Sequence, residues 1–186
     1  MGLRIIGGDL KGKKLHSVAD TKIRPTADRL REAIFNIISF RVRGAIVLDL
    51  FAGTGALGIE ALSRGAESAV FIDTSRKVLS LIQRNIKSCA LGSRAKIVKW
   101  DIINNLNCLS PTYRAFDLVF MDPPYNKSLI KASLFNLHRS NSLVKDAHII
   151  VEHSPSEPIP ENNPAFKFTD QRKYGKTLVS FLNYMV

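Results

Sequence analysis

The stretch 47–62 constrains the fold of this chain more than any other, because it joins an apolar run, a glycine turn and a helical pattern. The apolar run carries an acid near its end, Asp49, and Gly53, Gly55 and Gly58 follow in the spacing G-x-G-x-x-G. Glycines at this spacing allow a sharp turn, close approach of the backbone to a ligand, and close packing of helix on strand. The stretch therefore predicts the first strand–loop–helix unit of a nucleotide-binding α/β sheet, with loop amides facing the ligand.

The acid before the glycines indicates which ligand binds there. A dinucleotide would place its pyrophosphate at this helix N-terminus, where the charge of Asp49 would repel it. S-adenosylmethionine carries no phosphate but has an ammonium and a sulfonium group, which an acid attracts. Asp73 ends the next apolar run, and a carboxylate there can accept hydrogen bonds from the ribose of either ligand. Asp49 therefore favours the methyl donor over a nicotinamide cofactor.

Composition points to a polyanionic partner. The 186 residues carry a formal charge of +11, and residues 1–44 hold ten Lys and Arg against four Asp and Glu. No apolar stretch is long enough to span a bilayer, and the start of the chain lacks the apolar segment of a secretory signal. Cys89 and Cys108 are isolated and lack metal-ligand spacing. We expect a cytoplasmic protein that is monomeric and binds neither metal nor membrane.

From Ala45 onward the pattern alternates between apolar strands and amphipathic helices. Crossovers of this length give parallel strands with helices on both faces, and ligands bind above the carboxyl ends of the strands. The prediction is an α/β fold with a doubly wound, mostly parallel seven-stranded sheet and an antiparallel C-terminal hairpin. Strands are expected near 45–50, 68–72, 95–99, 117–121 and 147–152, helices near 56–64, 75–90, 102–109 and 127–139, and the hairpin at 166–172 and 177–184.

The amino-terminal segment is expected to bind nucleic acid. Residues 3–18 resemble a flexible, lightly cored hairpin, followed by a helix that Thr26 could cap. Apolar residues of that helix fall on one face, at Leu30, Ile34, Ile37 and Ile38, which leaves its basic residues elsewhere. An ordinary surface helix is the alternative. We divide the chain into a basic extension, 1–43, and a methyltransferase domain, 44–186, with candidate RNA contacts at Arg4, Lys11, Lys13, Lys14, Arg24, Thr26, Arg29 and Arg31.

Asp101-Ile102 follows the third expected strand and belongs at the same edge of the sheet as Asp49 and Asp73. The carboxylate of Asp101 and an adjacent backbone amide could bind the amino group and ring nitrogen of an adenine. Asp101 could equally cap the helix expected at 102–109, and the two roles are compatible.

Asp122-Pro123-Pro124-Tyr125 follows the fourth expected strand and is the candidate catalytic motif. Two prolines fix the backbone and remove two amide donors, so carbonyl and carboxylate oxygens face the cleft. An exocyclic base amine is a poor nucleophile because its lone pair is delocalised into the ring. If Asp122 and the Pro123 carbonyl each accept one N–H, the lone pair is freed, while Tyr125 offers a ring on which a flipped base can stack.

With these motifs the chain resembles the RsmD family of bacterial ribosomal RNA methyltransferases. The resemblance rests on Arg4-Ile5-Ile6-Gly7-Gly8, on Arg24-Pro25-Thr26 with Asp28-Arg29 and Arg31-Glu32, on residues 49–64, on residues 122–125, and on Lys173-Tyr174-Gly175. It implies a Rossmann-like class I methyltransferase with S-adenosylmethionine as donor, which modifies a guanine N2 amine in small-subunit (16S) ribosomal RNA. Family members commonly have Glu at the position of Asp73 and Asp at that of Ser75, which puts donor affinity in question.

We therefore predict a guanine-N2 methyltransferase that acts on small-subunit ribosomal RNA, either bare or in an assembled particle. An adenine-N6 methyltransferase acting on DNA is the nearest alternative, since that class shares the Asp-Pro-Pro-Tyr motif. A nicotinamide-dependent oxidoreductase and a non-catalytic RNA-binding protein are more distant alternatives. Donor contacts are predicted at Asp49, Phe51, Ala52, Gly53, Thr54, Gly55, Gly58, Asp73, Thr74, Ser75, Asp101 and Ile102.

Overall fold

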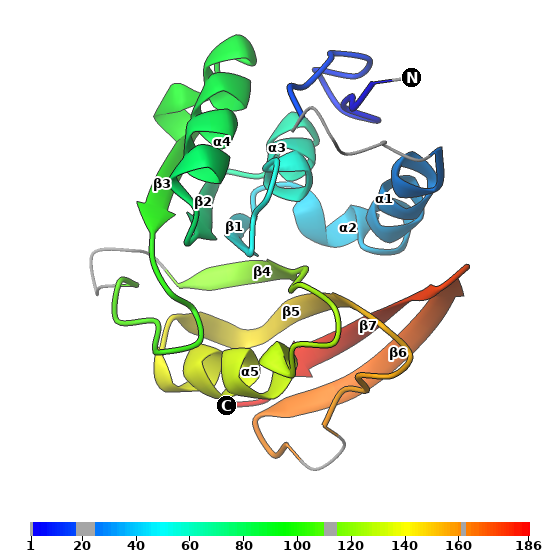
Figure 1. Cartoon of the computed structure of the whole chain (residues 1–186), viewed down its shortest axis with the longest axis vertical. Coiled ribbons are helices and arrows are strands. Elements are labelled where there is room, and N and C mark those ends of the chain that lie inside the picture. The colour runs from blue at the N-terminus through cyan, green and yellow to red at the C-terminus, as the bar shows by residue number, and fades with distance from the viewer. Residues whose placement is uncertain (1, 18–24, 110–114, 161–162) are drawn as a thin grey trace.

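The computed structural model describes residues 2–17, 25–109, 115–160 and 163–186, and a seven-stranded sheet forms its centre (Figure 1). The strands are β1 (Ile46–Leu50), β2 (Ser68–Asp73), β3 (Ala95–Lys99), β4 (Phe116–Met121), β5 (Leu143–His153), β6 (Phe166–Tyr174) and β7 (Thr177–Tyr184). Their order is β3-β2-β1-β4-β5-β7-β6, parallel through β5, with β7 antiparallel to both of its neighbours. This confirms the predicted sheet and its C-terminal hairpin.

Helices cover the two faces of the sheet unequally (Figure 1). The helices are α1 (Pro25–Ile37), α2 (Ser39–Val42), α3 (Ala56–Ser63), α4 (Arg76–Ser88) and α5 (Leu129–Arg139), with a 3-10 turn at Gly92–Arg94. The first four pack on one face, and α5 packs on the other beside the segment 101–109. The prediction of a helix over 102–109 is wrong: the segment forms turns, and Asn136 of α5 binds the carbonyls of Ile102 and Ile103 at 2.9 and 2.8 Å.

Side chains along β1 point alternately to the two faces of the sheet, and each face has its own hydrophobic core. Val47 packs on the face covered by α1–α4, whereas Leu48 and Leu50 pack on the face covered by α5. All three side chains are fully buried, which is why β1 lacks the polar alternation of a half-exposed strand. Asp49 shares a face with Val47, so its carboxylate lies under α3.

The amino-terminal hairpin is packed more firmly than its glycine content predicts. Arg4 and Lys14 form an antiparallel bridge, and Leu3, Ile5 and Leu15 lie in the same core cluster as Val47. Each of these three apolar side chains is at most 7% exposed. The expectation of a flexible, lightly cored element is therefore wrong, because three large side chains join the core of the main sheet. The hairpin lies beside α3 in Figure 1.

Helix α1 begins one residue earlier than the predicted cap. Pro25 is its first residue, a position where a missing N–H costs nothing, so Thr26 lies inside the first turn and not at the N-cap. Fully buried Phe35 belongs to the core-facing stripe, whereas Ile37, which was predicted to lie on it, is 36% exposed. Arg24 lies outside the described residues. In the part of the chain that the structure describes, no helix has the length and apolar character needed to cross a membrane.

Candidate active site

The glycine loop joins β1 to α3 through alternating left-handed residues. Phe51, Gly53 and Gly55 have φ angles of 59°, 55° and 75°, and at Phe51 the backbone accepts strain that glycine avoids. Gly58 is required for packing, because a Cβ there would lie 2.4 Å from a ring carbon of Phe71 and 3.1 Å from Oδ2 of Asp49. The predicted role of the third glycine in close helix–strand packing is confirmed.

Three amides of the loop are used within the protein, which the sequence did not indicate. Ala52 N–H donates to the Ile72 carbonyl at 3.1 Å, Gly53 N–H donates to Oδ2 of Asp73 at 3.3 Å, and Gly55 N–H donates to the Ala52 carbonyl at 2.7 Å. Below the loop, the Asn85 side chain donates to the Thr54 carbonyl at 2.9 Å. These contacts fix the loop before any ligand arrives.

Asp49 is the buried acid under this loop. It is 2% exposed, and its Oδ2 accepts the Gly58 N–H at 2.9 Å. Burial raises the pKa of Asp49 to about 8; the Gly58 hydrogen bond opposes the shift, and the charge of Asp73 adds to it. Asp49 is therefore mostly protonated at pH 7 when no cation lies nearby, and it becomes a charged partner only when a cation compensates for its lost hydration.

We expect donor affinity to depend on the protonation of Asp49. Because a cationic ligand favours the ionised carboxylate, binding of S-adenosylmethionine should weaken by up to about tenfold per pH unit as pH falls below the raised pKa of Asp49. Calorimetry between pH 6 and pH 9 measures this slope. The Asp49→Asn variant should bind S-adenosylmethionine more weakly and should lack the pH dependence that comes from Asp49. Any slope that remains in this variant reports titration of the ligand's own amine and is subtracted. An identical slope in both proteins would contradict the prediction.

The raised pKa of Asp49 also makes the free energy of unfolding depend on pH. Between the ordinary pKa of 3.8 and the raised value of about 8, the folded protein keeps a proton that the unfolded chain releases. The contribution of Asp49 to the free energy of unfolding thus falls as pH rises through this window.

The neighbouring strand ends hold the other predicted donor contacts. Asp73 ends β2, and its Oδ1 accepts the Ser75 N–H at 2.9 Å. Ser75 is the N-cap of α4, where Oγ accepts the Val78 N–H at 3.5 Å, and Thr74 between them is exposed. Asp101, also exposed, accepts hydrogen bonds from Ile103 N–H and Asn104 Nδ2 at 3.1 and 3.0 Å, so it caps a turn and not the predicted helix. Ile102 is 1% exposed in the α5-side core.

The Asp-Pro-Pro-Tyr motif lies directly beside the glycine loop. Leu50 pairs with Met121 across β1 and β4, so Asp122 follows β4 where the loop leaves β1. The residue is exposed, but surrounding protein reduces its hydration and raises the pKa of Asp122 well above its ordinary value. Repulsion from Glu152 and Asp49 raises it further. The two predicted halves of the site thus meet at one edge of the sheet.

Glu152 and Thr177 are site residues that the sequence analysis missed. The Tyr125 hydroxyl donates to Oε1 of Glu152 at 2.8 Å and lies 3.0 Å from Oγ1 of Thr177. Glu152 lies next to last in β5, so it is an acid at the end of a strand, the same signal that selected Asp49, Asp73 and Asp122. Applying that signal to the fifth strand would have found it. Thr177 carries no comparable signal.

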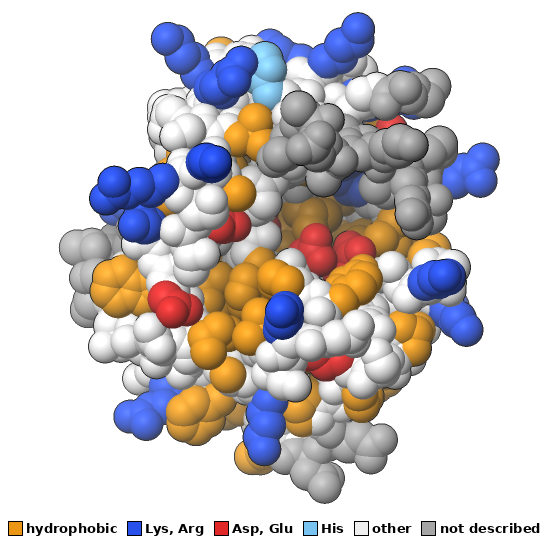
Figure 2. Space-filling model, in the orientation of Figure 1, with side chains coloured by type: hydrophobic (Ala, Val, Ile, Leu, Met, Phe, Trp, Pro, Cys, Tyr) orange, Lys and Arg blue, Asp and Glu red, His pale blue; other side chains and the backbone are white. Residues whose placement is uncertain are grey.

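Figure 2 shows acidic side chains inside a hollow that is bordered in part by apolar side chains, while most Lys and Arg side chains in view lie toward the outside of this face. Apolar walls suit a nucleobase, and acids suit its amine donors and a cationic ligand. Among the described residues, no group of three or more His, Cys, Asp or Glu side chains is placed to hold a metal ion.

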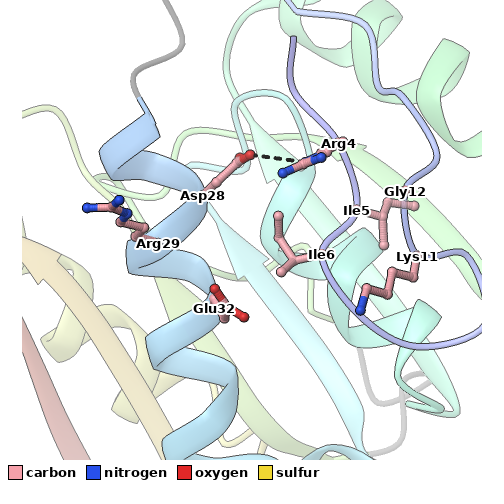
Figure 3. A pocket seen from close by; sticks show the side chains of 8 residues that line it. All are labelled: Arg4, Ile5, Ile6, Lys11, Gly12, Asp28, Arg29 and Glu32. Atoms are coloured by element: carbon pink, nitrogen blue, oxygen red, sulfur yellow. Dashed lines mark ion pairs between the residues drawn. The ribbon is translucent and has the colours of Figure 1, made fainter. Parts of the chain in front are cut away.

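Most of the predicted RNA contacts are available at the surface. Lys11, Lys13, Lys14 and Arg29 are exposed, and the Arg4 side chain is 46% exposed although it pairs with Asp28 at 3.5 Å. Some of them border a hollow of about 430 Å³ between the hairpin and α1 (Figure 3). In that view Asp28 and Glu32 point from α1 toward the hairpin, and Arg29 points the other way. The side chain of Thr26 lies outside the description.

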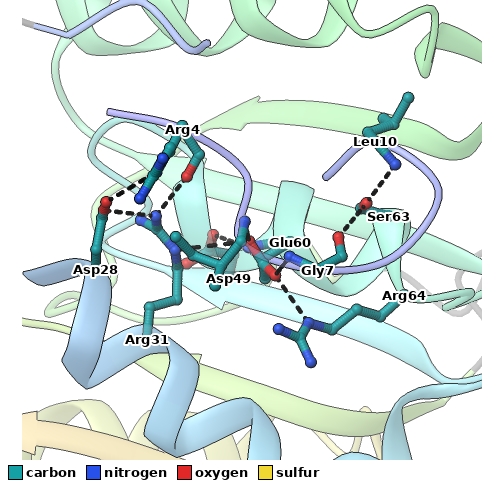
Figure 4. Close-up of polar contacts among 11 residues, drawn as sticks. Arg4, Gly7, Leu10, Asp28, Arg31, Asp49, Glu60, Ser63 and Arg64 are labelled. Atoms are coloured by element: carbon teal, nitrogen blue, oxygen red, sulfur yellow. Dashed lines mark hydrogen bonds and ion pairs between the residues drawn. The ribbon is translucent and has the colours of Figure 1, made fainter. Parts of the chain in front are cut away.

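Arg31 is an exception, and its predicted role is corrected. It is 5% exposed, and its guanidinium donates to the Arg4 carbonyl at 2.6 Å and to Asp28 at 3.1 Å (Figure 4). Its Nε lies 3.7 Å from Oε2 of Glu60. A phosphate could reach this side chain only by displacing those partners. Arg31 therefore supports the fold, and Arg29 remains the exposed arginine of this turn.

Glu60 of α3 is the acceptor on which this network converges (Figure 4). The residue is fully buried, and it accepts hydrogen bonds from the backbone N–H of Ile6 at 2.8 Å and of Gly7 at 2.7 Å, and from Arg64 Nε at 2.8 Å. At Gly8, φ is +74°, and a Cβ would lie 1.9 Å from the Ser63 carbonyl oxygen. The Ile-Gly-Gly segment is thus shaped to dock on the end of α3.

Comparison with known proteins finds a family and several relatives that match most of the chain. The family model described as Conserved hypothetical protein 95 matches residues 3–183. The protein YlbH of Bacillus subtilis is 37% identical over 96% of this chain and 97% of its own length. Ribosomal RNA small subunit methyltransferase D of Escherichia coli K12 is 35% identical over 85% of this chain and 78% of its own length.

Solved structures agree with the fold. The protein yhhF from Escherichia coli superposes with a TM-score of 0.85 and 29% identity, covering 99% of this chain and 98% of that one. The Thermus thermophilus protein TTHA0928 superposes with a TM-score of 0.79 and 28% identity, covering 99% of both chains.

Proposed function

The chain belongs to the RsmD family, described as Conserved hypothetical protein 95, and from this premise we propose that it methylates ribosomal RNA with S-adenosylmethionine as the donor. The acceptor in this proposal is the N2 amine of a guanine in small-subunit RNA. The observation that carries it is the register of β1 and β4, which sets Asp122 beside the glycine loop. A donor at the loop and an amine at Asp122 would then meet at one edge of the sheet.

The donor site fits a cationic nucleoside. Asp49 is a buried acid that gains from a positive ligand, and Asp73 ends β2 where ribose hydroxyls can reach a carboxylate. At Gly53 a Cβ would meet only the Phe51 carbonyl oxygen, 3.8 Å away, so the loop leaves open space at its outer side. S-adenosylmethionine supplies an activated methyl group carried on a positively charged sulfur.

The residues of the motif then activate the amine. The Asp122 carboxylate and the Pro123 carbonyl each accept one N–H of the exocyclic nitrogen, so its lone pair leaves conjugation with the ring and points toward the methyl carbon. Tyr125 is 38% exposed, and its hydroxyl is held by Glu152 and Thr177, which leaves the ring face for a flipped base to stack on. As the new N–C bond forms, the bond between the methyl carbon and the donor sulfur would break and leave a neutral thioether. The amine becomes positively charged, and Asp122 accepts the proton that it releases. Catalysis rests on positioning and electrostatics, with no covalent enzyme intermediate.

Nucleoside analysis tests the function directly. We expect mass spectrometry of small-subunit ribosomal RNA, after incubation with enzyme and donor, to reveal N2-methylguanosine. Both bare RNA from cells that lack the enzyme and reassembled particles from those cells should be offered, so that the test covers both forms of the substrate. Methylated adenine in DNA with unmodified RNA would instead establish the adenine-N6 alternative, which the ribosomal RNA names of the relatives disfavour.

The basic hairpin and the exposed side of α1 are proposed to bind RNA phosphates. Lys11 and Arg29 project from different elements and are both exposed, so their joint replacement tests the surface without touching the Glu60 network. We expect Lys11→Ala with Arg29→Ala to weaken RNA binding and to reduce the slope of log affinity against log salt by about two units, one for each lost phosphate contact. Donor binding should be unchanged. RNA titrations at several salt concentrations measure the slope.

A matched control comes from the end of the sheet away from the candidate site. Lys145 near the start of β5 and Lys167 near the start of β6 are both exposed. Replacing both with Ala removes the same net charge, and the salt slope should stay at the wild-type value. If the slope of log affinity against log salt falls by the same amount in both double variants, the effect reflects net charge alone, and the proposed RNA-binding surface is wrong.

A further inference from the structure

Glu152 ends its strand beside Asp122. Met121 of β4 pairs with Val151 of β5 in parallel register, so the residues that follow each of them lie side by side. Met121 and Val151 both face the α5-side core. Because side chains alternate, Asp122 and Glu152 both point to the opposite face, which also carries Asp49. Repulsion between Asp122 and Glu152 is strong enough to contribute to the raised pKa of Asp122, which agrees with this placement.

Oxygen atoms of the Asp122 and Glu152 carboxylates are available to accept hydrogen bonds from a ligand. Oε1 of Glu152 accepts the Tyr125 hydroxyl. In the part of the chain that the structure describes, Oε2 of Glu152 and both oxygens of Asp122 accept no hydrogen bond from the protein. Because Glu152 also holds the Tyr125 hydroxyl, its remaining acceptor lies close to the ring on which a base would stack. The site thus offers two neighbouring acceptors along one edge of that base.

The edges of guanine and adenine respond differently to a second acceptor. In guanine the N2 amine adjoins N1–H, so the edge presents donors side by side. In adenine the N6 amine adjoins an unprotonated N1, whose lone pair would face a carboxylate oxygen with no proton between them. A buried acceptor that is left unpaired against a lone pair is costly, and sites built on such hydrogen bonds discriminate strongly.

We propose that Glu152 is a specificity-determining residue that accepts the N1–H of guanine through Oε2, while Asp122 accepts an N–H of the N2 amine. The proposal rests on the proposed function and deepens it by assigning the choice between the two exocyclic amines to one side chain. Tyr125 links the roles, because the hydroxyl that holds its ring also orients Glu152. The structure thus separates amine activation by Asp122 from base selection by Glu152.

The test compares two RNA substrates that differ only at N1 and C6 of one base. Once the modified guanosine has been located, an RNA fragment is made with either guanosine or 2-aminopurine ribonucleoside at that position. Both bases carry the C2 amine, but 2-aminopurine has an unprotonated N1 and lacks O6. The Glu152→Gln variant changes only the proposed partner of N1, so a fall of the ratio in that variant assigns the preference to N1. We expect wild-type protein to favour guanosine in kcat/KM by at least about 100-fold, as sites that hydrogen-bond a substrate N–H do. In Glu152→Gln the amide can donate to N1, so the ratio should fall to within about tenfold.

Thr177→Val is the matched control. It removes the other partner of the Tyr125 hydroxyl but leaves both carboxylates in place. Its rate should fall on both substrates alike, with the substrate ratio of the wild type retained. Donor binding by calorimetry establishes that each variant is folded.

Two results would overturn the proposal: a wild-type protein that methylates both fragments equally, or a Glu152→Gln variant that keeps the full ratio. The first needs no variant, so misfolding cannot obscure it. Failure of the proposed function is distinct, because ribosomal RNA would then carry no N2-methylguanosine at all.

Discussion

The Asp122→Ala variant is expected to lose about 10³-fold in the rate of methyl transfer while binding S-adenosylmethionine almost as tightly as wild type. The carboxylate is the acceptor proposed to free the lone pair of the amine and to take its proton, and both effects are made only as the reaction proceeds. Donor contacts are assigned to β1, β2 and the glycine loop, so they remain. Single-turnover kinetics with enzyme in excess over RNA measure the rate, and calorimetry measures donor binding.

Folding of this variant should not suffer. Loss of hydration, together with the charges of Glu152 and Asp49, raises the pKa of Asp122, so the ionised group destabilises the folded protein at neutral pH. The contribution of Asp122 to the free energy of unfolding therefore falls as pH rises above the ordinary pKa of an aspartate. The Asp122→Ala variant does not suffer this destabilisation. Asp170→Ala on β6, a partly exposed acid paired with Arg172, is the control and should keep full activity. Equal loss of rate and donor affinity in Asp122→Ala would mean that Asp122 shapes the donor site and does not act on the amine.

Glu60→Ala is expected to lower the free energy of unfolding by about 3–5 kcal/mol, the largest stability effect predicted here. The substitution leaves the N–H groups of Ile6 and Gly7 without their acceptor, and it leaves the 5%-exposed Arg31 without one of its two acidic partners. Burial already lowers the pKa of Arg31, with Glu60 and Asp28 opposing that shift, so losing Glu60 increases the cost of keeping the charge buried. Urea unfolding followed by circular dichroism measures the change.

Exposed Glu32 of α1 provides the comparison for Glu60. Glu32→Ala should change the free energy of unfolding by less than about 0.5 kcal/mol, as surface substitutions usually do. A loss below about 1 kcal/mol in Glu60→Ala would indicate that water replaces the carboxylate, and that the hairpin is held by Leu3, Ile5 and Leu15 alone.

The strand–loop–helix unit could be predicted because its signals are local. Alternation of apolar runs and helices, three glycines at fixed spacing and acids at the ends of strands specify a parallel sheet with a site at one edge. Asp49, Asp73 and Asp122 were located in this way, before any contact was known. Helix 102–109 failed for the same reason: its local pattern resembled a helix, but Asn136 of α5 binds the Ile102 and Ile103 carbonyls of a turn.

The sequence by itself thus determined the sheet, the order of its elements along the chain and the edge at which the predicted site residues gather, since these follow from periodicity and from short-range turn chemistry. Only the tertiary structure decided which charged side chains serve the site and which serve the fold. Arg31 looked like a phosphate contact until Glu60, 29 positions away, proved to be its partner, and Thr177, which carries no signal in the sequence, reaches the candidate site only through Tyr125. The cost of burying a charge depends on the groups that surround it, and in this fold those groups come from distant parts of the chain.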